Sequence, residues 1–121
     1  LVRALEGEYC DWGAANELQA RYATRRFKSA ALITMMSAVA LGRRARVESI
    51  AVPVLVAFSG RDDVVSLEKV RQVFGRIGSE KKAMVEIDSA AGHVVAGDIS
   101  SPASTPEFVQ ILVSFIDDAL E

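Results

Sequence analysis

The sequence predicts an α/β fold in which parallel strands are flanked by helices. Two short apolar segments, residues 52–58 and 83–87, each end at a polar loop. Residues 66–77 and 105–120 carry apolar side chains at three- and four-residue spacing, which is typical of helices with one buried face. Strand and helix therefore alternate in the second half of the chain, and this order is typical of a parallel sheet.

The first part of the chain, residues 1–49, is predicted to be a separate helical or connecting segment. Residues 1–27 lack a clean hydrophobic period, although Asn16 is a suitable N-cap for a short helix that runs to about Tyr22. The stretch after that helix, up to Phe27, is expected to be extended. These features do not by themselves indicate a function.

Residues 28–45 are predicted to form a longer helix with Ser29 as its N-cap. Apolar residues recur along it at helical spacing, and arginines follow at its C-terminal end, where cations favour the helix dipole. Met35 and Met36 are most simply explained as core packing, because methionine fills gaps well. The alternative is a flexible apolar wall beside a substrate pocket.

The segment at residues 52–58 is apolar on both faces, which indicates a strand buried in a parallel sheet. Pro53 is tolerated because it stands at the start of the strand. The helix at 66–77 has an acid, Glu68, in its first turn and a glycine, Gly78, just past its end, and both positions favour helix termini. Its expected buried side chains are Val70, Val73, Phe74 and Ile77.

A second strand at 83–87 is followed by a long loop, residues 89–104, and by a last helix at 105–120. Pro106 falls at the first position of that helix, where proline is common. The side chains expected to face inward are Phe108, Ile111, Leu112, Phe115, Ile116 and Leu120. Residues 50–121 thus contain one βαβ unit, which is expected to be right-handed.

Two strands that are apolar on both faces cannot bury themselves, since sheets usually have about four to six strands. We therefore expect the sheet to be completed by an N-terminal half of the same protein or by a second copy of the chain. The first residue, Leu1, is not methionine, which favours the interpretation that the sequence is part of a longer protein.

Composition excludes several classes of function. The net charge is −2 with acids and bases interspersed, so no basic stripe indicates a nucleic-acid partner. The single cysteine, Cys10, excludes a disulfide framework and fits a cytoplasmic location. The longest apolar stretch, residues 30–41, is shorter than the ~20 residues of a membrane span.

The same reasoning predicts neither a cofactor nor a metal. The glycine-rich patterns G-x-G-x-x-G and the P-loop are absent from the chain. A single histidine among scattered acids is a poor metal site.

The residues suited to chemistry lie in the two polar loops that follow the strands. Asp62 and Asp63 come after the first strand, and His93, the only histidine, comes after the second. Open α/β sheets place their active sites at the carboxyl ends of parallel strands. A carboxylate and a histidine within about 2.6–3.2 Å would make a base and its orienting partner. Considered separately, a loop acid is more simply a solvated turn residue or a helix N-cap, and a loop histidine is more simply incidental.

A nucleophile to complete such a set is missing. The nucleophile elbow G-x-S-x-G does not occur in the chain. Ser59 stands at the end of the strand that leads to the acids, and Cys10 has no base near it in sequence.

The stretch I-A-V-P-V-L-V-A-F-S-G-R-D-D-V-V at 50–65 resembles the acid-bearing strand and loop of the α/β-hydrolase-fold serine hydrolases. The stretch S-A-A-G-H-V-V-A-G-D-I-S-S-P at 89–102 is similar to their histidine loop. Its form H-V-x-A-G-D-I-x-S-P-x-S-T resembles bacterial members of the serine aminopeptidase and monoacylglycerol-lipase-like branch. The resemblance runs from about Phe27 to the C-terminus.

This resemblance implies a partial α/β-hydrolase fold, the C-terminal half of such an enzyme, with residues 1–49 as a cap-like segment. It assigns the triad acid to Asp63, three residues after Gly60, and the general base to His93. The family usually has proline after the acid, where this chain has Val64. The nucleophilic serine and the oxyanion hole would belong to an N-terminal half.

Three functions follow as hypotheses. The first is the C-terminal part of a serine hydrolase that cleaves an ester or amide bond in a small molecule. The second is a non-catalytic half-domain that is stable only as a homo-oligomer. The third, a phosphoacceptor receiver domain, fits poorly, because a receiver has five βα units and carries its acidic pair after the first of them.

Overall fold

A computed structural model describes residues 7–121, so the first six residues of the predicted segment 1–49 lie outside it. The chain divides into two compact units, one ending at Ala45 and one running from Arg46 to Glu121. The structure has two sheets of two strands each, one antiparallel and one parallel, and helices accompany both, so the protein is mixed α/β. We describe each unit by itself.

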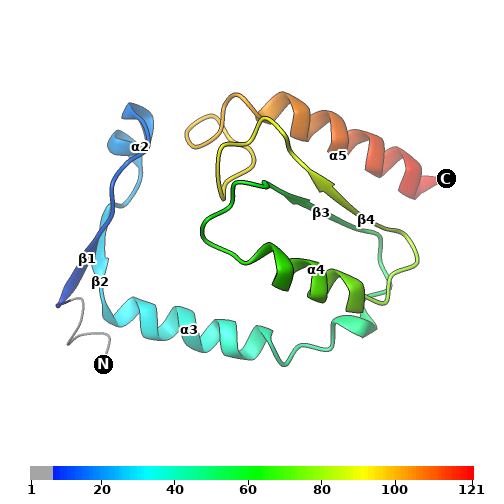
Figure 1. Ribbon diagram of the computed structural model, residues 1–121, viewed down its shortest axis with the longest axis horizontal. Helices are drawn as coiled ribbons and strands as arrows, with labels where there is room; N and C mark the ends of the chain where they lie inside the picture. Colours follow the sequence, from blue (N-terminus) through cyan, green and yellow to red (C-terminus); the bar gives the residue numbers. More distant parts are fainter. Residues whose placement is uncertain (1–6) are drawn as a thin grey trace. The chain divides into compact units, whose positions relative to one another are not determined.

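The first unit contains a small antiparallel ribbon and two helices (Figure 1). Strand β1 (Tyr9–Asp11) pairs with β2 (Arg26–Lys28), and helix α2 (Glu17–Tyr22) lies between them in sequence. The side chain of Asn16 accepts a hydrogen bond from the backbone N–H of Gln19, 2.8 Å away, so the predicted N-cap is confirmed. The stretch up to Phe27 that was expected to be extended ends in strand β2.

Helix α3 (Ala30–Gly42) follows β2 directly and confirms the predicted helix with shorter ends. Ser29 occupies the N-cap position, but its hydroxyl makes no capping bond and lies 3.4 Å from Cys10 Sγ. Its backbone is already helical, which turns the side chain away from the first free N–H groups. Met35 and Met36 are each 52% exposed, so the described part of the first unit does not bury them in a core.

The second unit is built on the parallel pair β3 (Val54–Phe58) and β4 (Lys82–Glu86). Helix α4 (Leu67–Arg76) connects the two strands, and helix α5 (Thr105–Leu120) follows a long loop. The two helices lie on opposite sides of the sheet (Figure 1). The predicted βαβ unit and its parallel pairing are therefore confirmed, whereas a complete hydrolase-type sheet is not seen in the described residues.

The boundary between the units falls before a single helical turn, η1 (Val47–Ser49), which the sequence analysis had placed in the first segment. This turn packs against the end of α4, where Arg76 Nε lies 2.8 Å from Glu48 Oε1. A Cβ at Gly78 would lie 2.0 Å from the backbone oxygen of Glu48. Gly78 therefore permits this close approach, and the C-cap of α4 is Ile77.

The buried centre of the second unit lies at the carboxyl ends of the strands. Ile87, Ala90, Ser59 and Ser104 are each 1% exposed, whereas every residue of β3 is only partly buried. Side chains predicted to face inward on the helices, Val73, Ile116 and Leu120, are exposed. The most deeply buried residues of this unit therefore lie at or after the ends of β3 and β4.

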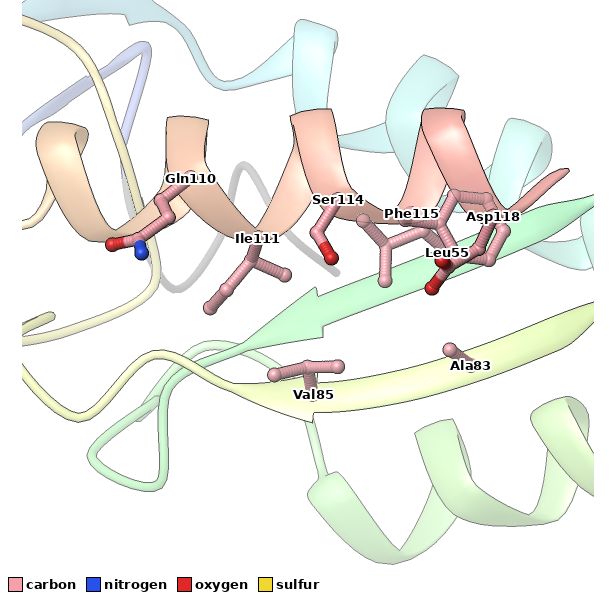
Figure 2. Close-up of a pocket in the computed structure, with 8 residues that line it drawn as sticks. All are labelled: Leu55, Ala83, Val85, Gln110, Ile111, Ser114, Phe115 and Asp118. Atoms are coloured by element: carbon pink, nitrogen blue, oxygen red, sulfur yellow. The ribbon is translucent and has the colours of Figure 1, made fainter. Parts of the chain in front are cut away.

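One face of the sheet is incompletely covered by α5, and a groove of about 360 Å³ remains there (Figure 2). Leu55, Ala83 and Val85 form its floor, and α5 contributes Ile111 and Phe115 with a polar row of Gln110, Ser114 and Asp118. Among residues 7–121, no helix has the combination of length and apolarity needed to cross a membrane.

Candidate functional site

The acid loop and the histidine loop leave the sheet from the same edge. Phe58 and Glu86, the last residues of β3 and β4, are partners in the parallel register. One further hydrogen bond, from the N–H of Ile87 to the carbonyl oxygen of Phe58 at 2.8 Å, closes the ladder. Because the strands are parallel, the loops that follow them leave the sheet at the same edge, where α/β proteins have their active sites.

Asp62 and His93 meet at this edge. Asp62 Oδ2 lies 2.8 Å from His93 Nδ1. The other carboxylate oxygen, Oδ1, accepts hydrogen bonds from the backbone N–H groups of Val64 and Val65, at 2.8 and 3.0 Å. The carboxylate is 5% exposed and the imidazole 46% exposed. One partner is thus held inside the protein, and the other is open to solvent.

The acid in contact with the histidine is Asp62, whereas the resemblance assigned the acid's role to Asp63. Asp63 is exposed, and the carboxylate beside the imidazole belongs to its neighbour. The reason is local: a turn is closed by the bond from the N–H of Asp62 to the oxygen of Ser59, and the Asp62 side chain folds back on the next amides. Counting residues from Gly60 does not reveal how that turn bends.

Neither acid caps the helix that follows. Ser66 is the N-cap of α4 and accepts a hydrogen bond from the N–H of Lys69 at 3.4 Å. The simpler interpretation of the acids, as N-caps, is therefore not seen.

Burial raises the pKa of the Asp62 carboxyl, but hydrogen bonds from His93, Val65 and Val64 outweigh this effect and hold the pKa below its ordinary value. An ionised carboxylate only accepts hydrogen bonds, so Nδ1 of His93 must be the donor. In the neutral imidazole Nε2 then carries the lone pair, and it is the ring atom available to take a proton. This is the arrangement of a histidine base held in one tautomer by an acid.

A buried hydroxyl connects the two loops. Ser59 Oγ donates to the carbonyl oxygen of Ala90, 2.9 Å away, and accepts from the N–H of Arg61 at 3.1 Å. The Arg61 guanidinium also reaches the carbonyl oxygen of Asp88, at 2.6 Å from Nη2. Ser59 is therefore a structural tie between the two loops.

The histidine loop is also held by α5. The carboxylate of Glu107, in the first turn of α5, accepts from the backbone N–H groups of Asp88 and Ser89 at 3.0 and 3.1 Å, and from the Ser89 hydroxyl. The Ser89 hydroxyl, the Ser89 amide and the Asp88 amide lower the pKa of Glu107, against a smaller opposing effect of burial. This carboxylate thus fixes the chain four and five residues before His93.

Hydroxyl groups at the start of α5 hold the loop after His93. Ser104 Oγ donates to the carbonyl oxygen of Val95 at 2.8 Å, and the Ser101 hydroxyl donates to that of Val94. Thr105 Oγ1 accepts from the N–H of Gly97 at 2.9 Å, and Gly97 has a positive φ of 115° that favours glycine. The sequence analysis did not assign these roles, although the S-S-P-A-S-T run was the available signal.

Cys10 is a free thiol in the first unit, next to Ser29. In the part of the chain that is described, no three His, Cys, Asp or Glu side chains gather as metal ligands would.

The groove of Figure 2 is separate from the acid–histidine pair. Its lining comes from the middle of β3 and β4 and from α5, and includes neither Asp62 nor His93. It marks an uncovered part of the sheet face and does not extend the candidate site.

Comparisons with known proteins add no family to this description. No family model, no curated protein and no solved structure matches the chain.

Proposed function

We propose that this chain supplies the acid and the base of a Ser-His-Asp triad, as the C-terminal part of a serine hydrolase that cleaves an ester or amide bond. The observation that carries the proposal is the 2.8 Å contact between Asp62 Oδ2 and His93 Nδ1 at the carboxyl ends of two parallel strands. The resemblance of both loops to hydrolase loops supports the same function. The nucleophilic serine is absent from this chain and comes from sequence outside it.

In this proposal His93 Nε2 takes the proton of the serine hydroxyl as the serine attacks the carbonyl carbon, and later gives it to the leaving group. Asp62 keeps Nδ1 protonated and stabilises the imidazolium that forms. The substrate class is a small ester or amide. The half-exposed imidazole is suited to this role, because its second nitrogen can face a partner group.

The test is labelling of the native sample with a fluorophosphonate probe, followed by intact-mass analysis. We expect a co-purifying polypeptide to carry the label on a serine, and we expect His93→Ala in this chain to abolish the labelling. Lys69→Ala, on the exposed side of α4, is the matched control and should leave labelling unchanged.

Two results would contradict the proposal. Equal labelling of the partner in the wild type and the His93→Ala variant would show that His93 is not the base. A single self-associated species that takes no label would remove the catalytic function from this chain.

A second candidate function is a non-catalytic half-domain that folds as a homo-oligomer. The observation in its favour is the second apolar face of α5, on which Val109, Val113, Ile116 and Leu120 are exposed. A helix that is apolar on two sides is normally covered on both. Native mass spectrometry separates the candidates, since only this one expects a labelling-negative assembly of identical chains.

A further inference from the structure

Glu107 differs from Glu68, the acid in the first turn of the other α-helix of this unit. Glu68, at the start of α4, accepts a hydrogen bond from Gln72 Nε2 of its own helix, at 2.9 Å. Glu107, at the start of α5, instead bonds two consecutive backbone amides and a hydroxyl of the histidine loop. Helix preference alone explains Glu68. It does not explain why Glu107 reaches outside its helix.

Glu107 is suited to three donors because its two carboxylate oxygens provide several acceptor sites. Oε1 takes the amide of Asp88, and Oε2 takes both the amide and the hydroxyl of Ser89. Hydrogen bonds to a charged acceptor are about twice as strong as neutral ones. A glutamine here would keep one acceptor oxygen and replace the other by a donor.

The carbonyl oxygen of the next residue of the loop, Ala90, accepts a hydrogen bond from the buried hydroxyl of Ser59, in the acid loop. Residues 88–90 are therefore fixed between α5 and the end of β3 just before the chain reaches His93. The acid loop contributes the hydrogen bonds from Ser59 to Ala90 and from Arg61 to Asp88, and α5 contributes those of Glu107. The position of the imidazole relative to Asp62 then depends on both.

We infer that Glu107 is a positioning residue that sets the contact between His93 and Asp62 by clamping residues 88 and 89 to α5. The inference rests on the proposed function, because it gives Glu107 a role in the same acid–base pair. Glu107 acts through the loop backbone and does not itself touch the imidazole.

The experiment is a long-range ¹H–¹⁵N NMR correlation that identifies the tautomer of the neutral histidine ring. His93 is the only histidine, so both ring nitrogens are assigned without ambiguity. The wild-type chain should show Nδ1–H as the major tautomer. Glu107→Gln should lose that preference, so that Nδ1–H is no longer the major form, and Glu68→Gln should give the wild-type spectrum.

Circular dichroism establishes whether each variant is folded. If Glu107→Gln does not fold, Ser89→Ala provides a second test of the inference. Ser89→Ala removes only the hydroxyl bond to Glu107 and should shift the tautomer ratio in the same direction by a smaller amount. A folded Glu107→Gln variant with the wild-type tautomer would overturn the inference while the acid–histidine pair stands. A wild-type chain without the Nδ1–H form would contradict the proposed function itself.

Discussion

The two loops that form the site are held in opposite ways. The acid loop, residues 59–65, is fixed by its own backbone, since Asp62 bonds to the amides of Val64 and Val65 and to the carbonyl of Ser59. The histidine loop, residues 88–104, is fixed mainly by side chains of α5 and by Ser59 across the sheet edge. One loop is a local turn, and the other is a long segment with distant supports.

The difference has a consequence for function. A local turn moves together with the end of its strand, because the hydrogen bonds that shape the turn around Asp62 join residues only two or three positions apart. A loop tied to another helix transmits any movement of that helix to the imidazole. The acid side of the pair should therefore tolerate changes elsewhere in the protein, and the histidine side should not.

The largest difference between the two loops is expected from Ser59→Ala, because the buried Ser59 hydroxyl bonds both within the acid loop and to the backbone of the histidine loop. Its loss leaves the buried carbonyl of Ala90 without this donor, which costs about 1–3 kcal/mol. Urea unfolding measures the change in the free energy of unfolding. Amide hydrogen exchange should show faster opening in residues 88–97 than in 62–65.

Ser79→Ala is the matched control, because Ser79 is also buried but bonds to Lys81 away from the site. It should lower stability without changing exchange in either loop. If Ser59→Ala left exchange in the histidine loop unchanged, the distant-support account of that loop would be wrong.

A smaller effect is expected from a change in pH, which alters the free energy of unfolding through the Asp62 carboxyl. Hydrogen bonds hold the pKa of the Asp62 carboxyl below its ordinary value in the folded state, against the opposing effect of burial. Such a group contributes stability above its unfolded pKa, about 3.9, and that contribution is lost as pH falls through the lower folded pKa. The free energy of unfolding should thus rise with pH below about 4, and Asp62→Asn should flatten this rise. Parallel curves for the two proteins would contradict the assignment.

Local patterns in the sequence predicted much of the fold. The period of apolar residues located α4 and α5, the doubly apolar run located β3, and Asn16 was identified as a cap. These features depend on residues a few positions apart. The ends of the strands and α-helices of the second unit were predicted to within two residues.

The site could be predicted only to the level of its loops. The sequence placed an acid and His93 at one sheet edge, and the structure brings them together. It could not select Asp62 over Asp63, because the choice depends on how the turn from Ser59 to Val65 folds. The sequence analysis missed the roles of Glu107, Ser101 and Ser104. Each bonds to loop backbone several residues or more away, and local patterns do not reveal such a partner.

The docking of η1 was missed in the same way. Glu48 contacts Arg76 and lies against Gly78, near the far end of α4. Nothing in residues 46–49 themselves indicates a partner about thirty residues later. The helix α3 is the opposite case, because its apolar residues predicted burial that the described part of the first unit does not supply.

The central claim is that Asp62 holds His93 in the tautomer of a general base, and the direct measurement compares the imidazole ¹⁵N shifts of the wild type, Asp62→Asn and Asp63→Asn. We predict Nδ1–H as the major neutral form in the wild type and in Asp63→Asn, and loss of that preference in Asp62→Asn. Loss of the Nδ1–H form in Asp63→Asn, with Asp62→Asn unchanged, would contradict the account and return the acid's role to Asp63.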